Sequence, residues 1–164
     1  MNFNDGLYNM YREVDELSML NKLFATLISE KLNISNYEAN TTIQNKLYLK
    51  DFLTDIDYTI TDSIEDVKNL IKIKKGYPIY KLDDIELISL IKTKVAGEYK
   101  ESIVIENIKD EINLILNLMR DILIKIEPNK NYEIVSVLSN ITYQLKKSLL
   151  DLQWVGNKIA VFLI

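Results

Sequence analysis

The sequence of 164 residues contains no cysteine and no histidine. Without cysteine the chain can form no disulfide, no thiolate nucleophile and no cysteine-ligated zinc or iron–sulfur site. Without histidine it can supply neither the imidazole of a Ser-His-Asp triad nor a histidine-ligated metal centre. The chemistry left open is that of carboxylates, lysine, tyrosine and serine, so most common catalytic designs are excluded.

Glycine and proline are also scarce, with 4 and 2 residues, which favours long helices over a chain of many turns. Charges of both signs are interspersed and sum to −4, and no block of Lys and Arg indicates nucleic-acid binding. No apolar run reaches the roughly 18 residues of a membrane span, and the N-terminus does not read as a signal peptide. We therefore expect a cytoplasmic protein that binds neither nucleic acid nor membranes.

Apolar residues recur at steps of three and four in four long segments, which is the spacing of amphipathic helices. These segments cover about residues 7–32, 42–75, 99–126 and 132–162, and a short amphipathic segment lies at 80–95. The polar stretch after the first segment, "NISNYEANTT", is typical of helix caps and turns. In "KKGYP", Gly76 can take the left-handed conformation that ends a helix, and Pro78 blocks continuation.

The order long, long, short, long, long predicts a single all-α domain spanning residues 1–164. The expected architecture is a four-helix bundle with one long crossover that carries the short helix, as in ferritin-like folds. Apolar and polar residues do not alternate over any long stretch, so the sequence does not favour strands. Trp154, on the last predicted helix, is expected to pack in the core.

The chain contains three stretches whose order and spacing match a known family: "LNKLFATLISEKLNISNYEANTT", "KGYPIYKLDD" and "LMRDILIKIEPNKNYEIVSVLSNI". They resemble the Dps (DNA-protection-during-starvation) family of miniature ferritins. In that family the first helix begins with Leu-Asn and ends in an Asn-Tyr-His-Trp-like motif, and the second ends in Gly-Gly-x-Pro. The resemblance covers residues 20–162 and implies a homo-oligomeric cage, expected to be a dodecamer, that serves iron storage and stress protection.

The resemblance also implies a site shared by two subunits, where the family oxidises ferrous iron with His, His and Asp from one subunit and Asp and Glu from the other. Carried over without gaps, the first three positions fall on Glu38, Lys50 and Thr54, and the partner positions on Glu65 and Asn69. A lysine ammonium repels iron and pairs with carboxylates, so we expect a degenerate site that is inactive or weak. Glu38 and Glu65 remain as candidate metal ligands, and iron is the only cofactor that the resemblance implies. Whether the protein is an enzyme stays open, although the replaced positions favour that it is not.

Two other functions stay open at this stage. The abundance of Asn, Ile and Lys and the absence of catalytic residues are compatible with a non-enzymatic helical interaction or regulatory protein, such as a phage-borne one. The second alternative is a carboxylate-only metal-dependent oxidase that adds a stripe of four aspartates to Glu38 and Glu65. This stripe lies on the second predicted helix and consists of Asp51, Asp55, Asp62 and Asp66. A solvated outer face would show the same spacing, and we favour that interpretation of the stripe.

Overall fold

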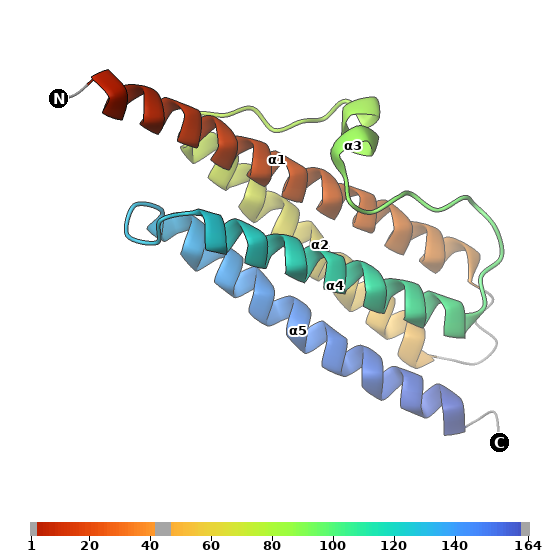
Figure 1. The fold of residues 1–164 in the computed structure, drawn as a ribbon. Helices are drawn as coiled ribbons and strands as arrows, with labels where there is room; N and C mark the ends of the chain where they lie inside the picture. Colours follow the sequence, from red (N-terminus) through yellow and green to blue (C-terminus); the bar gives the residue numbers. More distant parts are fainter. Residues whose placement is uncertain (1–2, 42–46, 162–164) are drawn as a thin grey trace.

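The computed structural model describes residues 3–41 and 47–161, with side chains described at 15–41 and 47–160. Its five helices are α1 (Phe3–Asn40), α2 (Leu47–Ile73), α3 (Leu82–Ile88), α4 (Glu101–Lys125) and α5 (Tyr132–Val161). The four long helices form a bundle, and α3 lies in the connection between α2 and α4 (Figure 1). The predicted all-α, ferritin-like four-helix architecture is therefore confirmed. None of the described helices combines the length and the apolar character that crossing a membrane requires.

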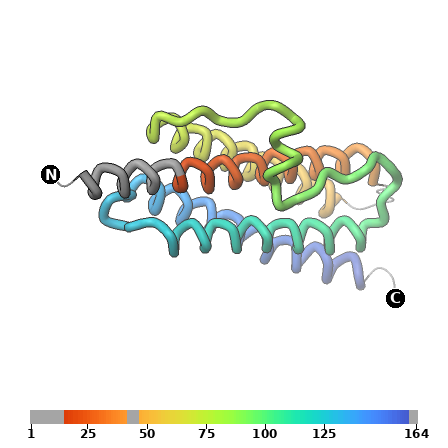
Figure 2. The backbone as a smooth tube through the Cα atoms, turned by 45° about the horizontal axis from the view of Figure 1, so that its top comes forward, coloured from red at the N-terminus to blue at the C-terminus, as the bar shows by residue number. Residues whose placement is uncertain are grey.

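The long helices form a ring in the order α1, α2, α5, α4, and each runs antiparallel to its two neighbours (Figure 1). In this arrangement α2 and α4 lie across the bundle from each other and point the same way. The 27 residues of α2 rise about 40 Å, so the chain must travel back along the bundle before α4 can begin. The crossover of residues 74–100 does this along α1, and α3 packs against α1 (Figure 2).

The apolar stripes of the four long helices meet in one continuous core. Its fully buried members include Phe24 of α1, Leu53 of α2, Ile112 of α4 and Leu145 of α5. Isoleucine is a weak helix former, so packing of these stripes rather than intrinsic propensity stabilises the helices.

α1 continues through the polar stretch in which the sequence predicted its end, and reaches Asn40. The buried side chains of Ile34 and Tyr37 extend the apolar stripe into this stretch. Asn36 also finds partners outside the helix, because its side-chain amide donates to the carbonyls of Lys94 and Val95 at 3.2 and 3.3 Å. The prediction of a helix end near residue 32 is wrong, and residues 42–46, the expected start of the second helix, lie outside the described part of the chain.

The end of α2 differs from the prediction in one residue. Lys75, not Gly76, has the left-handed backbone, with φ of 58°. The N–H of Lys75 donates to the carbonyl of Lys72, and that of Gly76 to the carbonyl of Ile71, which is the Schellman pattern. A Cβ at position 76 would collide with the side chain of Leu17. A larger residue here would require the side chain of Leu17 of α1 to move, so glycine permits the close approach of the crossover to α1.

Candidate functional site

The five positions that the family resemblance assigns to a shared iron site lie on α1 and α2. Glu38 is in the last turn of α1, and the other four follow along α2. The side chains of Glu38, Lys50, Glu65 and Asn69 are exposed, and Thr54 is half-buried. All five therefore lie at or near the surface of the single chain.

One chain cannot bring these positions together. Fifteen residues of α2 separate Lys50 from Glu65, a rise of about 22 Å along one helix. Thr54 donates to the carbonyl of Lys50 at 3.1 Å, and Glu65 forms an ion pair with Lys68. Among the described residues no ion pair joins Lys50 to Glu38 or to Glu65. The two groups of positions therefore form no common site within one chain.

The residue types at these positions do not fit an iron-oxidising centre. They supply two carboxylates, one hydroxyl, one amide and the ammonium of Lys50, which has no lone pair for a metal. Iron in carboxylate-bridged centres is held by several Glu or His ligands that project toward one point. Within residues 15–41 and 47–160 no group of three or more Asp or Glu side chains has that geometry.

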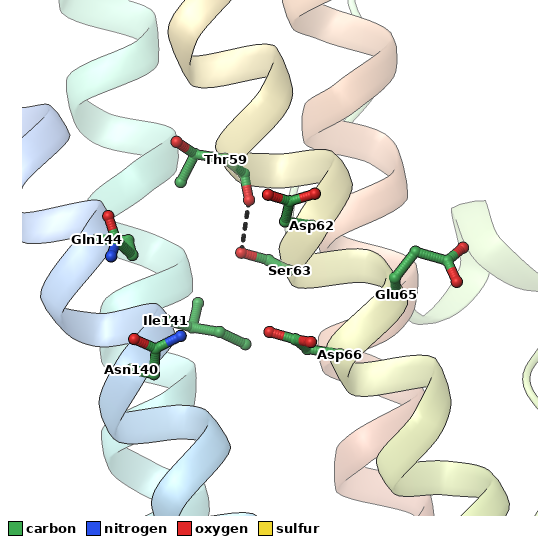
Figure 3. Close-up of a pocket in the computed structure, with 8 residues that line it drawn as sticks. All are labelled: Thr59, Asp62, Ser63, Glu65, Asp66, Asn140, Ile141 and Gln144. Atoms are coloured by element: carbon green, nitrogen blue, oxygen red, sulfur yellow. Dashed lines mark hydrogen bonds between the residues drawn. The ribbon is translucent and has the colours of Figure 1, made fainter.

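The four aspartates of the predicted stripe line two hollows between α2 and α5. The first, of about 410 Å³, is bordered by Asp62, Glu65 and Asp66 of α2 and by Asn140 and Gln144 of α5. In Figure 3 Asp66 points toward α5, whereas the carboxylate of Glu65 points to the opposite side of α2. Burial, and then the negative charge of Asp62, raise the pKa of Asp66. Because Glu65 and Asp66 diverge, the residues of a carboxylate-only oxidase do not converge on one point in a single chain.

The second hollow, of about 400 Å³, contains the other two aspartates, Asp51 and Asp55, and is bordered by Trp154. Trp154 is 50% exposed, so the prediction that it packs in the core is wrong. Its ring meets that of Tyr48 edge-on with centroids 5.3 Å apart, and the ammonium of Lys158 lies 5.3 Å from its centroid. The stripe of α5 that faces the core runs through other positions, Leu152, Val155 and Ile159.

The most unusual chemistry in the chain is a carboxyl pair that the sequence analysis missed. Glu30 of α1 is 0% exposed and Glu111 of α4 is 5% exposed. Glu111 accepts hydrogen bonds from the amide of Asn33 at 3.0 Å and from the hydroxyl of Tyr37 at 3.2 Å. The ammonium of Lys94, from the crossover, lies 3.6 Å from the same oxygen of Glu111. Glu111 is therefore well supplied with donors.

Glu30 is not supplied in this way, since neither of its carboxyl oxygens has a hydrogen-bond donor among the described residues. Burial, followed by the negative charge of Glu111, raises the pKa of Glu30 well above its ordinary value of 4.5. Burial also raises the pKa of Glu111, whereas the charge of Lys94 and the hydrogen bonds from Tyr37 and Asn33 lower it. Burial of Tyr37, and then the charge of Glu111, raise the pKa of the Tyr37 hydroxyl. This hydroxyl therefore keeps its proton and remains a hydrogen-bond donor. Burial therefore favours a protonated Glu30, whereas the donors and the ammonium around Glu111 favour its ionised form.

A sequence pattern was available for this pair. Glu30 lies between Leu27 and Ile34 in the apolar stripe of α1, and Glu111 lies between Ile108 and Ile115 in that of α4. A carboxylate at a core position of a helix must find a partner or be neutral.

Solved structures of Dps and ferritin-like proteins share this fold at low sequence identity. A DPS protein from Vibrio cholerae O1, a member of a broad superfamily of ferritin-like diiron-carboxylate proteins, matches with a TM-score of 0.80 and 16% identity, over 87% of this chain and 89% of its own. A Dps protein from Bacillus brevis matches with a TM-score of 0.80 and 14% identity, over 87% and 95%. A dodecameric thioferritin from Bacteroides fragilis, a bacterioferritin-related protein, matches with a TM-score of 0.76 and 14% identity, over 88% of each chain.

No protein-family model matches the sequence, and no curated protein matches it. At identities this low the structural likeness establishes the fold alone. The chain has the ferritin-like fold of Dps proteins.

Proposed function

We propose that this chain is the subunit of a Dps-like cage related to iron storage and stress protection, and that its iron-oxidising site is inactive or weak. The observation that carries the proposal is the match to Dps folds over 87% of the chain. The weak or absent activity is inferred from Lys50, which the resemblance assigns to a ligand position. The cage is expected to be a cytoplasmic homo-oligomer, most simply a dodecamer like the thioferritin that shares the fold.

Exposed apolar side chains support self-association. The crossover displays five of them within fourteen residues, and all are at least 40% exposed: Tyr77, Tyr80, Leu82, Leu87 and Leu90. Apolar surface in water costs about 25 cal/mol per Å² relative to its burial, and gathered apolar residues are typical of contact surfaces. Burial against a second copy would remove this cost, and a second copy is also what the divided positions on α2 require.

The same positions support weak or absent oxidation of iron. In the proposed cage, Glu38, Lys50 and Thr54 of one subunit face Glu65 and Asn69 of the next. Lys50 then supplies a positive charge where the family supplies a ligand, and it can neutralise Glu65 without a metal. Iron in this proposal is cargo, and the chain's own residues do little to oxidise it.

Particle mass tests the assembly. Mass photometry of the full chain is expected to give a species of twelve subunits, or a smaller closed oligomer. A monomer at every concentration would refute the cage and favour the alternative of a helical interaction protein.

Oxidation of ferrous iron tests the site. We expect ferrous iron added without oxygen, then exposed to air, to form ferric iron no faster with the protein than in buffer. A double variant, Glu38→Ala with Glu65→Ala, is expected to behave like the unmodified chain, with Glu106→Ala on the exposed face of α4 as the matched control. Fast oxidation that is lost in the double variant alone would show a working carboxylate site and overturn this part of the proposal.

A further inference from the structure

We propose that Glu30 and Glu111 share one proton inside the bundle, and that this proton fastens the crossover to α1 and α4. The proposal concerns the single chain and does not depend on the proposed cage. It rests on three observations. Glu30 lies on the same face of α1 as Asn33 and Tyr37, which both donate to Glu111. The buried oxygens of Glu30 have no donor among the described residues, and Asn33 and Lys94 connect Glu111 to the crossover.

Asn33 connects the carboxyl pair to the crossover backbone. Its amide nitrogen donates to Glu111 and to the carbonyl of Lys92, both at 3.0 Å. Its amide oxygen accepts from the backbone N–H of Lys94 at 2.7 Å. The side chain of Lys94 then returns to Glu111. A change in the charge or position of Glu111 therefore acts directly on the contacts of residues 92–94.

The charge of the site balances only when the pair holds one proton. Glu111 as a carboxylate and Lys94 as an ammonium cancel, and a neutral Glu30 donates to Glu111. If Glu30 also ionises, two buried carboxylates face each other with one ammonium between them. The other titratable group that acts on the pair is the hydroxyl of Tyr37 of α1, which stays neutral, and none from α2 or α5 acts on it among the described residues.

The side chains around Glu30 and Glu111 are better suited to hold a proton than to bind a metal ion. Hard cations take six or more oxygen ligands in Ca²⁺ sites and an octahedral set in Mg²⁺ sites. Here two carboxylates, a phenol and an amide surround a site that already contains the ammonium of Lys94.

Loss of the proton leaves a repulsion between the carboxylates of Glu30 and Glu111. This repulsion is relieved if Glu111, with Asn33 and Lys94, moves outward. Residues 89–99 are then expected to open as the pH rises.

Hydrogen exchange of the full chain measures this opening. In the unmodified protein the protection factors of amides in residues 89–99, corrected for intrinsic exchange, should fall with rising pH by up to about tenfold per pH unit, the limit for one proton. In Glu30→Gln, which keeps the shape and a donor but cannot ionise, they should not change with pH. Glu106→Gln, the exposed control on α4, should behave like the unmodified chain. Equal pH dependence in the unmodified chain and Glu30→Gln would overturn the proposal.

Infrared spectroscopy gives a test that needs no variant. At neutral pH exposed carboxyl groups are ionised, so a carbonyl band of a protonated carboxyl group should remain in the unmodified protein. That band should be missing in Glu30→Gln. Its absence from the unmodified protein would overturn the proposal even if the variant did not fold. Loss of the band on adding Mn²⁺, with increased protection of residues 89–99, would also overturn it and assign the pair to a cation.

Discussion

Replacing Glu30 with methionine should stabilise the protein, and more so at alkaline pH. Met has a similar length and no ionisable group, so the variant removes the carboxyl group whose oxygens lack donors. Glu111 keeps Asn33, Tyr37 and Lys94 as partners. The substitution therefore removes the group that the folded chain must keep protonated, and Glu111 keeps its other partners.

The magnitude follows from the burial of Glu30 and the direction of its pKa shift. The gain expected from Glu30→Met at about pH 8 is about 1–3 kcal/mol, because the folded chain must keep Glu30 protonated at a pH where the unfolded chain does not. The pKa of Glu30 is raised in the folded chain, so the folded state holds a proton that the unfolded state has lost. The free energy of unfolding of the unmodified protein thus falls as the pH rises from 4.5, the ordinary value, to the raised pKa. One proton contributes at most about 1.4 kcal/mol per pH unit to this fall.

Urea unfolding followed by circular dichroism measures both quantities. It should be run at about pH 5 and about pH 8, at one protein concentration, because the proposed assembly would also stabilise the chain. The difference between Glu30→Met and the unmodified protein should be small at the lower pH and larger at the higher one. Glu106→Met is the control and should show no such trend. A difference independent of pH, or destabilisation at the higher pH, would show that Glu30 is not held in a neutral form.

Three further substitutions test the contacts around the core in the same unfolding assay. Tyr37→Phe removes a donor to Glu111 and should cost about 1 kcal/mol; a loss near zero would mean that this hydrogen bond adds nothing. Asn131→Ala removes the acceptor of Lys74, at 2.6 Å, and should cost about 1–3 kcal/mol, whereas an unchanged midpoint would contradict the role given to it. Leu145→Ala, at a fully buried position, should lower the free energy of unfolding by about 2–5 kcal/mol. Trp154→Ala should lower it by less. The reverse order would place Trp154 in the core.

The sequence was sufficient to predict the boundaries of those helices that end at a local signal, such as a proline or a group of polar residues. The predicted segments 99–126 and 132–162 became Glu101–Lys125 and Tyr132–Val161, with residue 162 outside the described part. Pro128 and the polar residues around it separate the two helices, and regular apolar stripes run up to that break. The end of α1 lacked such a local signal. Asn36 reads as a turn residue, and what keeps it helical is its contact with carbonyls of the crossover nearly sixty residues later in the chain.

For the candidate metal ligands, the sequence could predict the helix on which each residue lies but not whether the residues come together. Alignment placed Glu38 and Glu65 on α1 and α2, and the structure leaves both exposed. In the proposed cage, Glu38 of one subunit would face Glu65 of another. A single chain does not contain that contact, so the role of both residues stays a prediction. Trp154 was misplaced for a simpler reason. Its large apolar ring suggested burial, but its position on α5 faces away from the residues that form the core stripe.

Two of the contacts between the crossover and the bundle are ion pairs with a buried carboxyl group, and these two differ in charge balance. At its start, Lys74 lies 3.5 Å from Glu16 of α1, with Asn131 bonded to both side chains. That attachment sets one carboxylate against one ammonium and needs no shared proton. Near its end, two carboxyl groups are set against Lys94, and one proton is required for balance.

Raising the pH should therefore release one end of the crossover before the other. Amides in residues 89–99 should lose protection first, whereas those in residues 74–80, beside Glu16, should keep theirs over the same range of pH. The comparison is made within one molecule and one exchange experiment, so differences in assembly or overall stability affect both ends together. Equal loss at the two ends would mean that the crossover opens as a unit, and that the charge balance at Glu30 does not set the point at which it opens.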